Sequence, residues 1–379
     1  MMMKSKNLNR QVVSLFILIF FGLFPVFNAL GQEKNFLYVA TPGIRNYVEY
    51  GGVGIIVFDV DNGYKFVKRI PTWNVPEGKE PENIKGIVAN AQTGMLYLTT
   101  PQRVACLDLK TEKIVWEKTF EEGCDRLAIS PDGLLLYVPS FEKSPWYVIN
   151  ALNGEVVNRI ETNSGAHNTI YGLDGKHVFL AGLRSPYLSV AETNTHTVAK
   201  KVGPFTEPVR PFTINGNQTR CYVNINDLLG FEIGDIQTGK MVSRVEVRGY
   251  QTGTPKRHGC PSHGIALTHD EKEIWLCDGP NSMLHIFDVS GPKPVQKTSI
   301  KLRDQPGWIS FSIDGRTAYP STGEVIDVQT KKVIATLEDE AGRQVQSEKL
   351  LEIVFDDGKP IRVADQFGLG HKTSLTKNK

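Results

Sequence analysis

The feature that most limits the fold of this chain is an internal repeat of about 40 to 45 residues. An apolar segment that ends in a polar turn occurs seven times, and the turns begin at Asp59, Asp108, Asn150, Glu192, Asp235, Asp288 and Asp327. The intervals between these positions are 49, 42, 42, 43, 53 and 39 residues. A run rich in β-branched residues follows each turn, as in a β-hairpin.

A second signal alternates with the first one along the chain. Here an apolar segment leads through an Asp-Gly turn into a strand with an aromatic residue, as at Asp132-Gly133 before Tyr137 and at Asp314-Gly315 before Tyr319. Each unit therefore contains four short strands, which is typical of one blade of a β-propeller. After residue 31 no segment has a sustained helical period, so the sequence predicts an all-β fold.

The count of strands predicts seven four-stranded blades in a single domain of residues 32–379. The first outer hairpin, Gly54–Ile70, has no inner strand before it, whereas the last inner strand, Leu351–Phe355, has no outer strands after it. Pairing the two chain ends closes the ring and removes the exposed edges that an open array would leave. Both Phe36–Ala40 and Ile361–Asp365 fit the second strand of this shared blade, and the sequence leaves that choice open.

Residues 1–31 have the pattern of a secretory signal peptide. Lys4, Lys6 and Arg10 precede a nearly unbroken apolar run, Val12 to Phe27, and the small residues Ala29 and Gly31 suit a peptidase that cuts before Gln32. The alternative is an uncleaved membrane anchor, since the run approaches the length of a transmembrane helix. We expect cleavage, a secreted or periplasmic protein, and no membrane span in the mature chain.

Charge and cysteine content exclude several classes of function. Removal of residues 1–31 takes away three basic and no acidic residues, which leaves 40 Lys and Arg against 41 Asp and Glu. A near-neutral mature chain predicts no nucleic-acid partner. An odd number of cysteines leaves at least one unpaired, and their spacing indicates neither a dithiol motif nor a covalent haem; they are Cys106, Cys124, Cys221, Cys260 and Cys277.

The repeats resemble those of the YVTN-repeat propellers, including the YncE-like exported proteins. The resemblance lies in the Asp-Gly turns, in strands such as Leu96–Thr100 and Cys221–Asn224, and in outer turns such as Asp61-Asn62-Gly63, and it covers about 330 residues. It departs from the pattern at Gly216-Asn217-Gln218, within the unit Arg210 to Val247. The resemblance implies a propeller but not an activity, because that family contains binding proteins, surface-layer proteins and relatives of lactonases.

Three insertions point to one face of the predicted ring. Trp73–Glu82 and Gly249–Pro261 precede inner strands and account for the two long repeat intervals, and Thr41–Tyr50 joins the second and third strands of the first blade. All three loops open at the same end of the channel. Because loops on a rigid scaffold carry function more often than the scaffold itself, we expect the ligand site there.

The starts of the inner strands supply the candidate site residues. Alignment of the blades on their second-strand aromatics places six residues at one equivalent position, namely Lys85, Asp125, His167, Arg210, His263 and Gly307. The next position adds Arg126, Asn168 and Trp308, and the neighbouring insertion adds Lys256 and His258. Basic groups outnumber Asp125, so the sequence predicts a site for an anionic or carbohydrate-like ligand, formed by Lys85, Asp125, Arg126, His167, Arg210, His263 and Trp308.

Two simpler interpretations compete with a ligand site. The charged groups can pair with one another around a water-filled channel, with Asp125 next to Arg210 or Lys85. The segment His258-Gly259-Cys260-Pro261-Ser262-His263 contains metal-binding residue types, but no second pair lies at metal-site spacing, so no metal or other cofactor is predicted.

The sequence leaves two classes of function open. The first is a binding protein for an anionic small molecule, a glycan or a protein partner. The second is a lyase for an acidic polysaccharide, in which Arg210 or Lys85 neutralises a uronate and His167 or His263 takes the neighbouring proton. A lactonase fits less well, because it needs several acidic metal ligands and Asp125 is the only acid of the six-residue set. Binding is the preferred interpretation.

Overall fold

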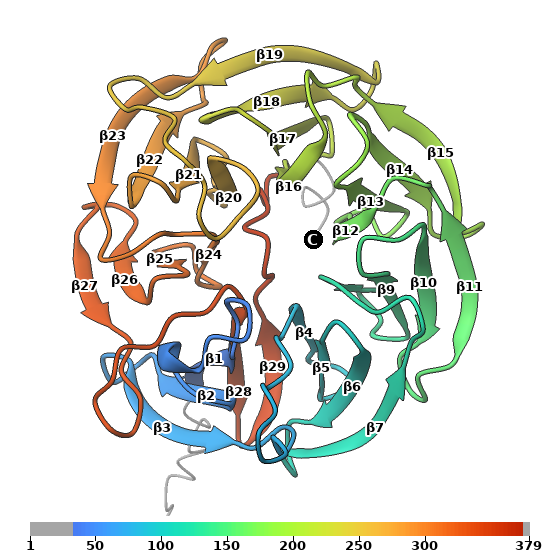
Figure 1. Cartoon of the computed structure of the whole chain (residues 1–379), viewed down its shortest axis with the longest axis vertical. Coiled ribbons are helices and arrows are strands. Elements are labelled where there is room, and N and C mark those ends of the chain that lie inside the picture. Colours follow the sequence, from blue (N-terminus) through green and yellow to red (C-terminus); the bar gives the residue numbers. More distant parts are fainter. Residues whose placement is uncertain (1–32, 374–379) are drawn as a thin grey trace, which may run out of the picture. The chain divides into compact units, whose positions relative to one another are not determined.

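The computed structural model describes residues 33–373, so the expected signal sequence lies outside the described residues. Seven antiparallel sheets surround a central channel (Figure 1), which confirms the predicted seven-bladed all-β propeller. Within the described range the one helical segment is a short 3-10 turn, η1 (Val48–Tyr50). No helix in that range is long and apolar enough to cross a membrane.

Six sheets have four strands, and each blade is named after its innermost strand. Three of them are the β4 blade, with β4 (Gly86–Asn90), β5 (Met95–Thr99), β6 (Arg103–Asp108) and β7 (Lys113–Thr119); the β8 blade, with β8 (Ala128–Ile129), β9 (Leu135–Pro139), β10 (Pro145–Asn150) and β11 (Val156–Glu161); and the β12 blade, with β12 (Ala166–Tyr171), β13 (His177–Gly182), β14 (Leu188–Glu192) and β15 (Thr197–Val202). The others are the β16 blade, with β16 (Val209–Ile214), β17 (Arg220–Ile225), β18 (Gly230–Asp235) and β19 (Lys240–Glu246); the β20 blade, with β20 (Ser262–Leu267), β21 (Glu273–Asp278), β22 (Met283–Asp288) and β23 (Val295–Lys301); and the β24 blade, with β24 (Ile309–Phe311), β25 (Thr317–Pro320), β26 (Glu324–Asp327) and β27 (Val333–Thr336).

The seventh sheet, the closing blade, joins the two ends of the chain. Its strands lie in the order β29-β28-β1-β2-β3, and their bounds are β29 (Lys359–Val363), β28 (Leu350–Asp356), β1 (Lys34–Thr41), β2 (Gly54–Asp59) and β3 (Lys65–Ile70). The antiparallel pairing of β28 with β1 confirms that the ring closes between its terminal strands. The open question is also answered, because β1 is the second strand and β29 is a fifth strand on the channel side of β28.

The segment after β29 crosses the channel and ends against the β16 and β20 blades (Figure 1). The carbonyl oxygen of Gly368 accepts hydrogen bonds from the Leu267 amide (2.9 Å) and from the Thr213 hydroxyl (2.8 Å). Phe367 and Leu369 are both 4% exposed, so the crossing segment is packed within the ring. This segment, residues 364–373, therefore obstructs the channel.

Two local devices explain the repeat in the sequence. The aromatic residue of the second strand is buried in every blade, where it packs between sheets; the seven are Tyr38, Tyr97, Tyr137, Phe179, Tyr222, Trp275 and Tyr319. In most blades the Asp or Asn of the outer turn caps that turn, as when Asp108 Oδ1 accepts hydrogen bonds from the amides of Lys110 and Thr111. The turn between the first two strands differs in the β16 blade, where the sequence has Gly216-Asn217-Gln218 in place of Asp-Gly. There Asn215 Oδ1 accepts hydrogen bonds from the amides of Thr219 and Arg220 and so stabilises the turn.

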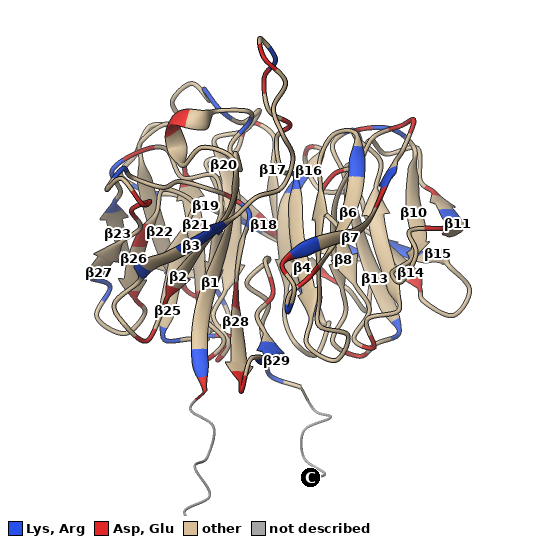
Figure 2. Cartoon of the chain, turned by 90° about the horizontal axis from the view of Figure 1, so that it is seen from below, with Lys and Arg blue, Asp and Glu red and all other residues tan. Residues whose placement is uncertain are grey.

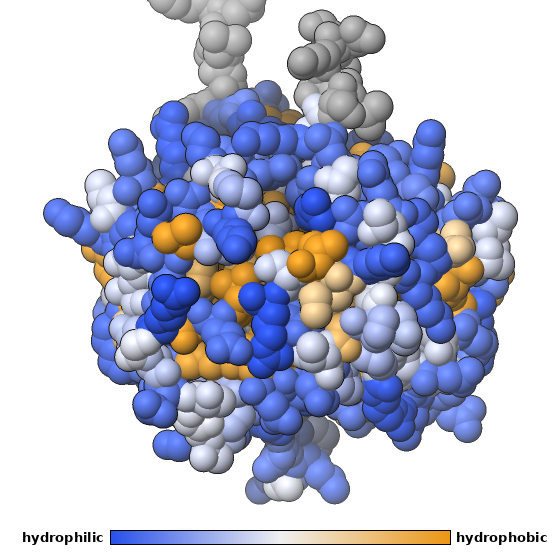
Figure 3. All heavy atoms as spheres, turned by 90° about the horizontal axis from the view of Figure 1, so that it is seen from above, coloured by the Kyte–Doolittle hydropathy of each residue, from blue (hydrophilic) through white to orange (hydrophobic). Residues whose placement is uncertain are grey.

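The outermost strands face solvent on one side. In β19, for example, exposed and partly buried residues alternate along the strand. Figure 3 shows one flank of the ring, where the surface is mostly hydrophilic and apolar residues lie between polar ones near its middle.

One acidic group within the closing blade is buried beside the β24 blade. Glu352 of β28 is 5% exposed, and its carboxylate accepts a hydrogen bond from the Tyr319 hydroxyl at 3.1 Å. The pKa of Glu352 is raised from 4.5 to about 7, chiefly by burial and in smaller part by the nearby Asp314 and Asp61, whereas the hydrogen bonds from the Tyr319 hydroxyl and the Ile313 amide lower it. The folded protein therefore holds this proton more tightly than the unfolded chain.

We predict that Glu352→Gln stabilises the protein only at neutral and alkaline pH. The stabilising contribution of protonated Glu352 is complete below pH 4.5 and is lost as the pH rises to about 7, where the folded state must bury a carboxylate. Relative to the parent protein, the variant should be equally stable at pH 4.5 and more stable at pH 8 by up to roughly 3 kcal/mol in urea unfolding. Glu207→Gln, at an exposed position, is the control, and a pH-independent effect of Glu352→Gln would contradict the prediction.

Candidate functional site

The three predicted insertions meet on one face of the ring, which we call the insertion face. In chain order the first insertion is Thr41–Tyr50, the second Trp73–Glu82 and the third Gly249–Pro261. Arg257 of the third donates a hydrogen bond to the Tyr50 hydroxyl of the first at 2.6 Å, and the Arg257 carbonyl oxygen accepts one from Arg45 at 2.8 Å. Asn46 of the first insertion contacts Glu80 of the second. In Figure 2 the tallest loops rise from one face, whereas β1 begins at the opposite face.

The register of the strands confirms that the candidate residues are equivalent and adds a seventh. In each blade the candidate lies three residues before the inner-strand partner of the buried aromatic, as with Lys85 before Val88, which pairs with Tyr97. In the closing blade Tyr38 pairs with Leu351, which places Glu348 at this position. Our sequence alignment missed Glu348 because the second strand of that blade was undecided. Tyr38 was the signal that could have identified it.

The first group in the channel mouth is centred on Asp125, which is 1% exposed. One carboxylate oxygen accepts a hydrogen bond from Nδ1 of His167 at 2.7 Å, and the other lies 3.4 Å from Nζ of Lys85. Burial by itself would raise the pKa of Asp125, but Lys85 and His167 outweigh it and hold the pKa below its usual value. Asp125 is therefore a carboxylate that orients the His167 ring and leaves Nε2 of that ring for another partner.

The second group contains Arg126, Trp308, Glu348 and Lys349, all of which are buried. The Arg126 guanidinium lies 3.3 Å from the centre of the Trp308 ring, and it donates a hydrogen bond to the Glu348 carbonyl oxygen at 3.0 Å. The Lys349 ammonium lies 2.8 Å from Glu348 Oε2 and donates to the Gly43 carbonyl oxygen. Although burial opposes it, the cations hold the pKa of Glu348 well below its usual value, and burial lowers the pKa of Lys349.

Two histidines connect these groups. The ring of His263 stacks on that of His258 with centroids 4.0 Å apart, and it lies 6.4 Å from the ring of His167. Nδ1 of His263 donates a hydrogen bond to the Gly307 carbonyl oxygen at 2.8 Å. Burial lowers the pKa of His263 well below its usual value, so this imidazole is neutral and its Nε2 carries a lone pair.

The structure brings six of the seven predicted site residues into one connected set around the mouth: Lys85, Asp125, Arg126, His167, His263 and Trp308. We call this set, together with His258, Glu348 and Lys349, the mouth cluster. Arg210 lies beside it, where its guanidinium donates to Asn226 Oδ1 at 2.6 Å and to the Gly259 carbonyl oxygen at 3.3 Å. Among the described residues Arg210 forms no ion pair with a carboxylate.

The channel is closed below the mouth cluster. The Trp308 indole N–H donates to the carbonyl oxygen of Gln366 at 2.6 Å, and the Gln366 amide donates to the Leu127 carbonyl oxygen. Several buried polar atoms near this level have no hydrogen-bond partner within residues 33–373, including both amide atoms of Asn168 and Oε1 of Gln366. The segment that contains Gln366 therefore closes the channel below the mouth cluster, and we call the mouth above this floor the cup.

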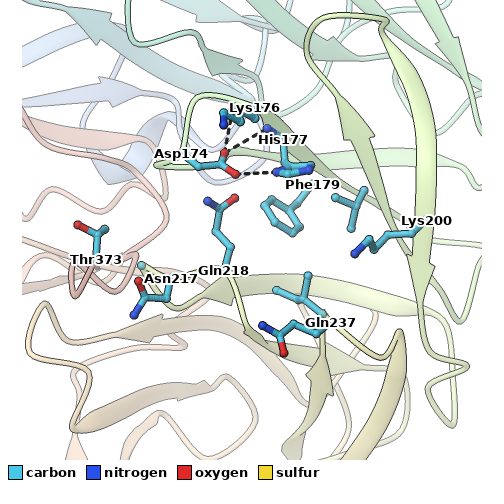
Figure 4. A pocket seen from close by; sticks show the side chains of 12 residues that line it. Asp174, Lys176, His177, Phe179, Lys200, Asn217, Gln218, Gln237 and Thr373 are labelled. Atoms are coloured by element: carbon cyan, nitrogen blue, oxygen red, sulfur yellow. Dashed lines mark hydrogen bonds and ion pairs between the residues drawn. The ribbon is translucent and has the colours of Figure 1, made fainter. Parts of the chain in front are cut away.

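A separate pocket lies on the opposite face, between the β12 and β16 blades (Figure 4). It encloses about 480 Å³ and is lined by Asp174, His177, Phe179 and Gln237, among others. The Asp174 carboxylate accepts hydrogen bonds from the amides of Lys176 and His177 and contacts the His177 ring. Its polar groups thus stabilise a turn, which makes this pocket a weaker candidate than the mouth.

All five cysteines are buried free thiols in the structure. Burial raises the pKa of the Cys260 thiol, which lies closest in sequence to the mouth histidines, to about 12. A protonated, enclosed thiol is a poor nucleophile, so the cysteines are not candidates for catalysis.

No protein-family model matches the chain, and no curated protein matches it either.

We predict that Asp125 and Lys85 are energetically coupled. Asp125→Asn should destabilise the protein by about 3 kcal/mol, because it leaves a largely buried ammonium without its carboxylate. Lys85→Met introduced into Asp125→Asn should then cost much less than in the parent protein. A double-mutant cycle by urea denaturation measures the coupling, and additive losses would contradict it.

Proposed function

We propose that this protein is a binding propeller that holds an anionic, polyhydroxylated ligand, such as a uronate-containing glycan, in the mouth on the insertion face. The observation that supports this proposal most strongly is the excess of basic over acidic side chains in the cup. The equivalent positions and those that follow them contribute Lys85, Arg126, Arg210 and Lys349 against only Asp125 and Glu348.

The exposure of these groups divides their roles. Arg126, Trp308 and Lys349 are at most 4% exposed, so they act from beneath the surface of the cup. Lys85, His167 and Arg210 are partly exposed and can contact a ligand that arrives from solvent. Arg210 is suited to a carboxylate, because its planar guanidinium offers paired donors and has no carboxylate partner among residues 33–373.

A second candidate function is a lyase for an acidic polysaccharide. The observation that favours it is the Asp125–His167 hydrogen bond, which holds His167 with Nδ1 protonated and Nε2 available as a base. In such an enzyme Arg210 would neutralise the uronate carboxylate while His167 takes the neighbouring proton; a carbon–carbon double bond then forms as the adjacent glycosidic C–O bond breaks, and the leaving sugar oxygen takes up a proton.

We also propose that the protein is exported and, in line with the repeats, is of the YVTN-like type. The support for export is the basic, apolar and small-residue order of residues 1–31.

We predict that the mature chain binds an oligogalacturonate more tightly than a neutral oligosaccharide of equal length, as measured by calorimetry. Arg210→Gln should weaken this binding about tenfold, the loss expected for one charged hydrogen bond. Arg316→Gln is the matched control, because Arg316 is highly exposed and follows a turn on the opposite face. Equal affinity for the neutral sugar, or no effect of Arg210→Gln, would contradict the proposal.

The same mixtures separate binding from catalysis. A lyase generates an unsaturated product that absorbs ultraviolet light, and His167→Ala should abolish it, whereas a binding protein returns the oligosaccharide unchanged. We expect binding without turnover.

We predict that the protein recovered after export begins at Gln32. Amino-terminal sequencing of the exported protein tests this directly, and a retained Met1 would contradict signal cleavage.

A further inference from the structure

Beside the cationic part of the cup lies a compact set of metal-binding side chains. His258, His263 and Glu348 each direct one donor atom inward, and the three donor atoms lie within 4.8 Å of one another. They come from the third insertion, from the start of β20 and from the segment before β28, so they are brought together only by the closed ring.

Two of these donor atoms lack hydrogen-bond partners although they are enclosed. Nε2 of His258 and Oε1 of Glu348 lie 2.9 Å apart, which makes them an ion pair when His258 is protonated, but neither atom forms a hydrogen bond of good geometry within residues 33–373. An unsatisfied buried polar atom is costly. A cation bound between this imidazole nitrogen and this carboxylate oxygen would give both atoms a partner.

The surroundings prepare these side chains as ligands. The Nδ1–H group of His263 is bound to the Gly307 carbonyl oxygen, an arrangement common behind metal-binding histidines because it fixes the tautomer and directs Nε2 outward. Lys349 and Arg126 occupy the Oε2 side of Glu348, which leaves Oε1 toward His258. Glu348 is 5% and His263 8% exposed, so both ligands are held in position.

Gly307 makes this arrangement possible. A Cβ atom at this position would collide with both Nε2 of His258 and Oε1 of Glu348. The backbone of Gly307 has no positive φ, so its lack of a side chain, and not its conformation, is what the site requires.

We propose that His258, His263 and Glu348 form a binding site for a divalent transition metal ion such as Zn²⁺. Two imidazoles and one carboxylate are a donor set that zinc accepts, with a fourth position open to solvent or to a ligand. Donor atoms around tetrahedral zinc lie about 3.3 Å apart, so the His258 ring must tilt out of its stack on His263 to complete the set. This site differs from the sequence-based expectation of no metal, because Glu348 was absent from that prediction.

The proposal goes beyond the proposed function and is tested separately from it. Mature protein freed of metal with a chelator, with the chelator then removed, is titrated with Zn²⁺ by calorimetry and with Co²⁺ by visible absorption, with no oligosaccharide present. We expect one equivalent of metal, a Co²⁺ spectrum of low-coordinate type, and a higher melting temperature with Zn²⁺, since a ligand that binds only the native state stabilises it.

Variants identify the ligands. His258→Ala and Glu348→Gln should each weaken Zn²⁺ binding at least tenfold, and Gly307→Ala should do the same through its collision with two of the ligands. His371→Ala is the matched control, since His371 stacks on His269 outside this cluster and should not contribute. If Glu348→Gln prevents folding, His258→Ala, in a surface loop, still decides the question.

Two results would overturn the proposal. One is the absence of Zn²⁺ binding to the folded parent protein at millimolar concentration. The other is unchanged Zn²⁺ affinity in folded His258→Ala protein. Neither result bears on oligogalacturonate binding, which is measured with a chelator present.

Discussion

The pairing of β28 with β1 is the interaction on which the rest of the structure depends. It joins residues more than 300 positions apart through six consecutive residue pairs. Without it the closing blade would lose its inner strands, and the facing edges of β28 and β1 would be unpaired. The same pairing fixes Glu348 and Lys349 at the channel mouth, so ring closure and assembly of the site are a single event.

The C-terminal segment changes the nature of the channel. Strand β29 adds a fifth strand on the inner side of the closing blade, and residues 364–373 then cross to the β16 and β20 blades. A propeller channel with two open ends would admit water from both sides. Here the buried segment provides a floor, and the polar groups at the insertion face line a cup in which charge interactions are stronger than in bulk water.

The mouth cluster is organised as linked pairs of opposite charge and not as a uniform basic patch. Asp125 holds Lys85 and His167, and Glu348 holds Arg126, Lys349 and the His258 side of the cup. Of the two pairings that the competing interpretation named for Asp125, the one with Lys85 is present and the one with Arg210 is not. Arg210, beside the mouth cluster, has no carboxylate partner among the described residues, so it can contact an acidic ligand.

The sequence by itself determined the number of blades, the positions of the strands and the face that carries the insertions. These properties are local and repeated, because a buried aromatic and a capped turn give the same signal in each unit. Six of the seven equivalent positions at the mouth could be predicted for the same reason. Only the tertiary structure decided which terminal strand lies next to β28, and hence that Glu348 is the seventh. The crossing segment and the contact of His258 with Glu348 depend on residues that are distant in sequence and carry no periodic signal, so only the closed ring brings them together.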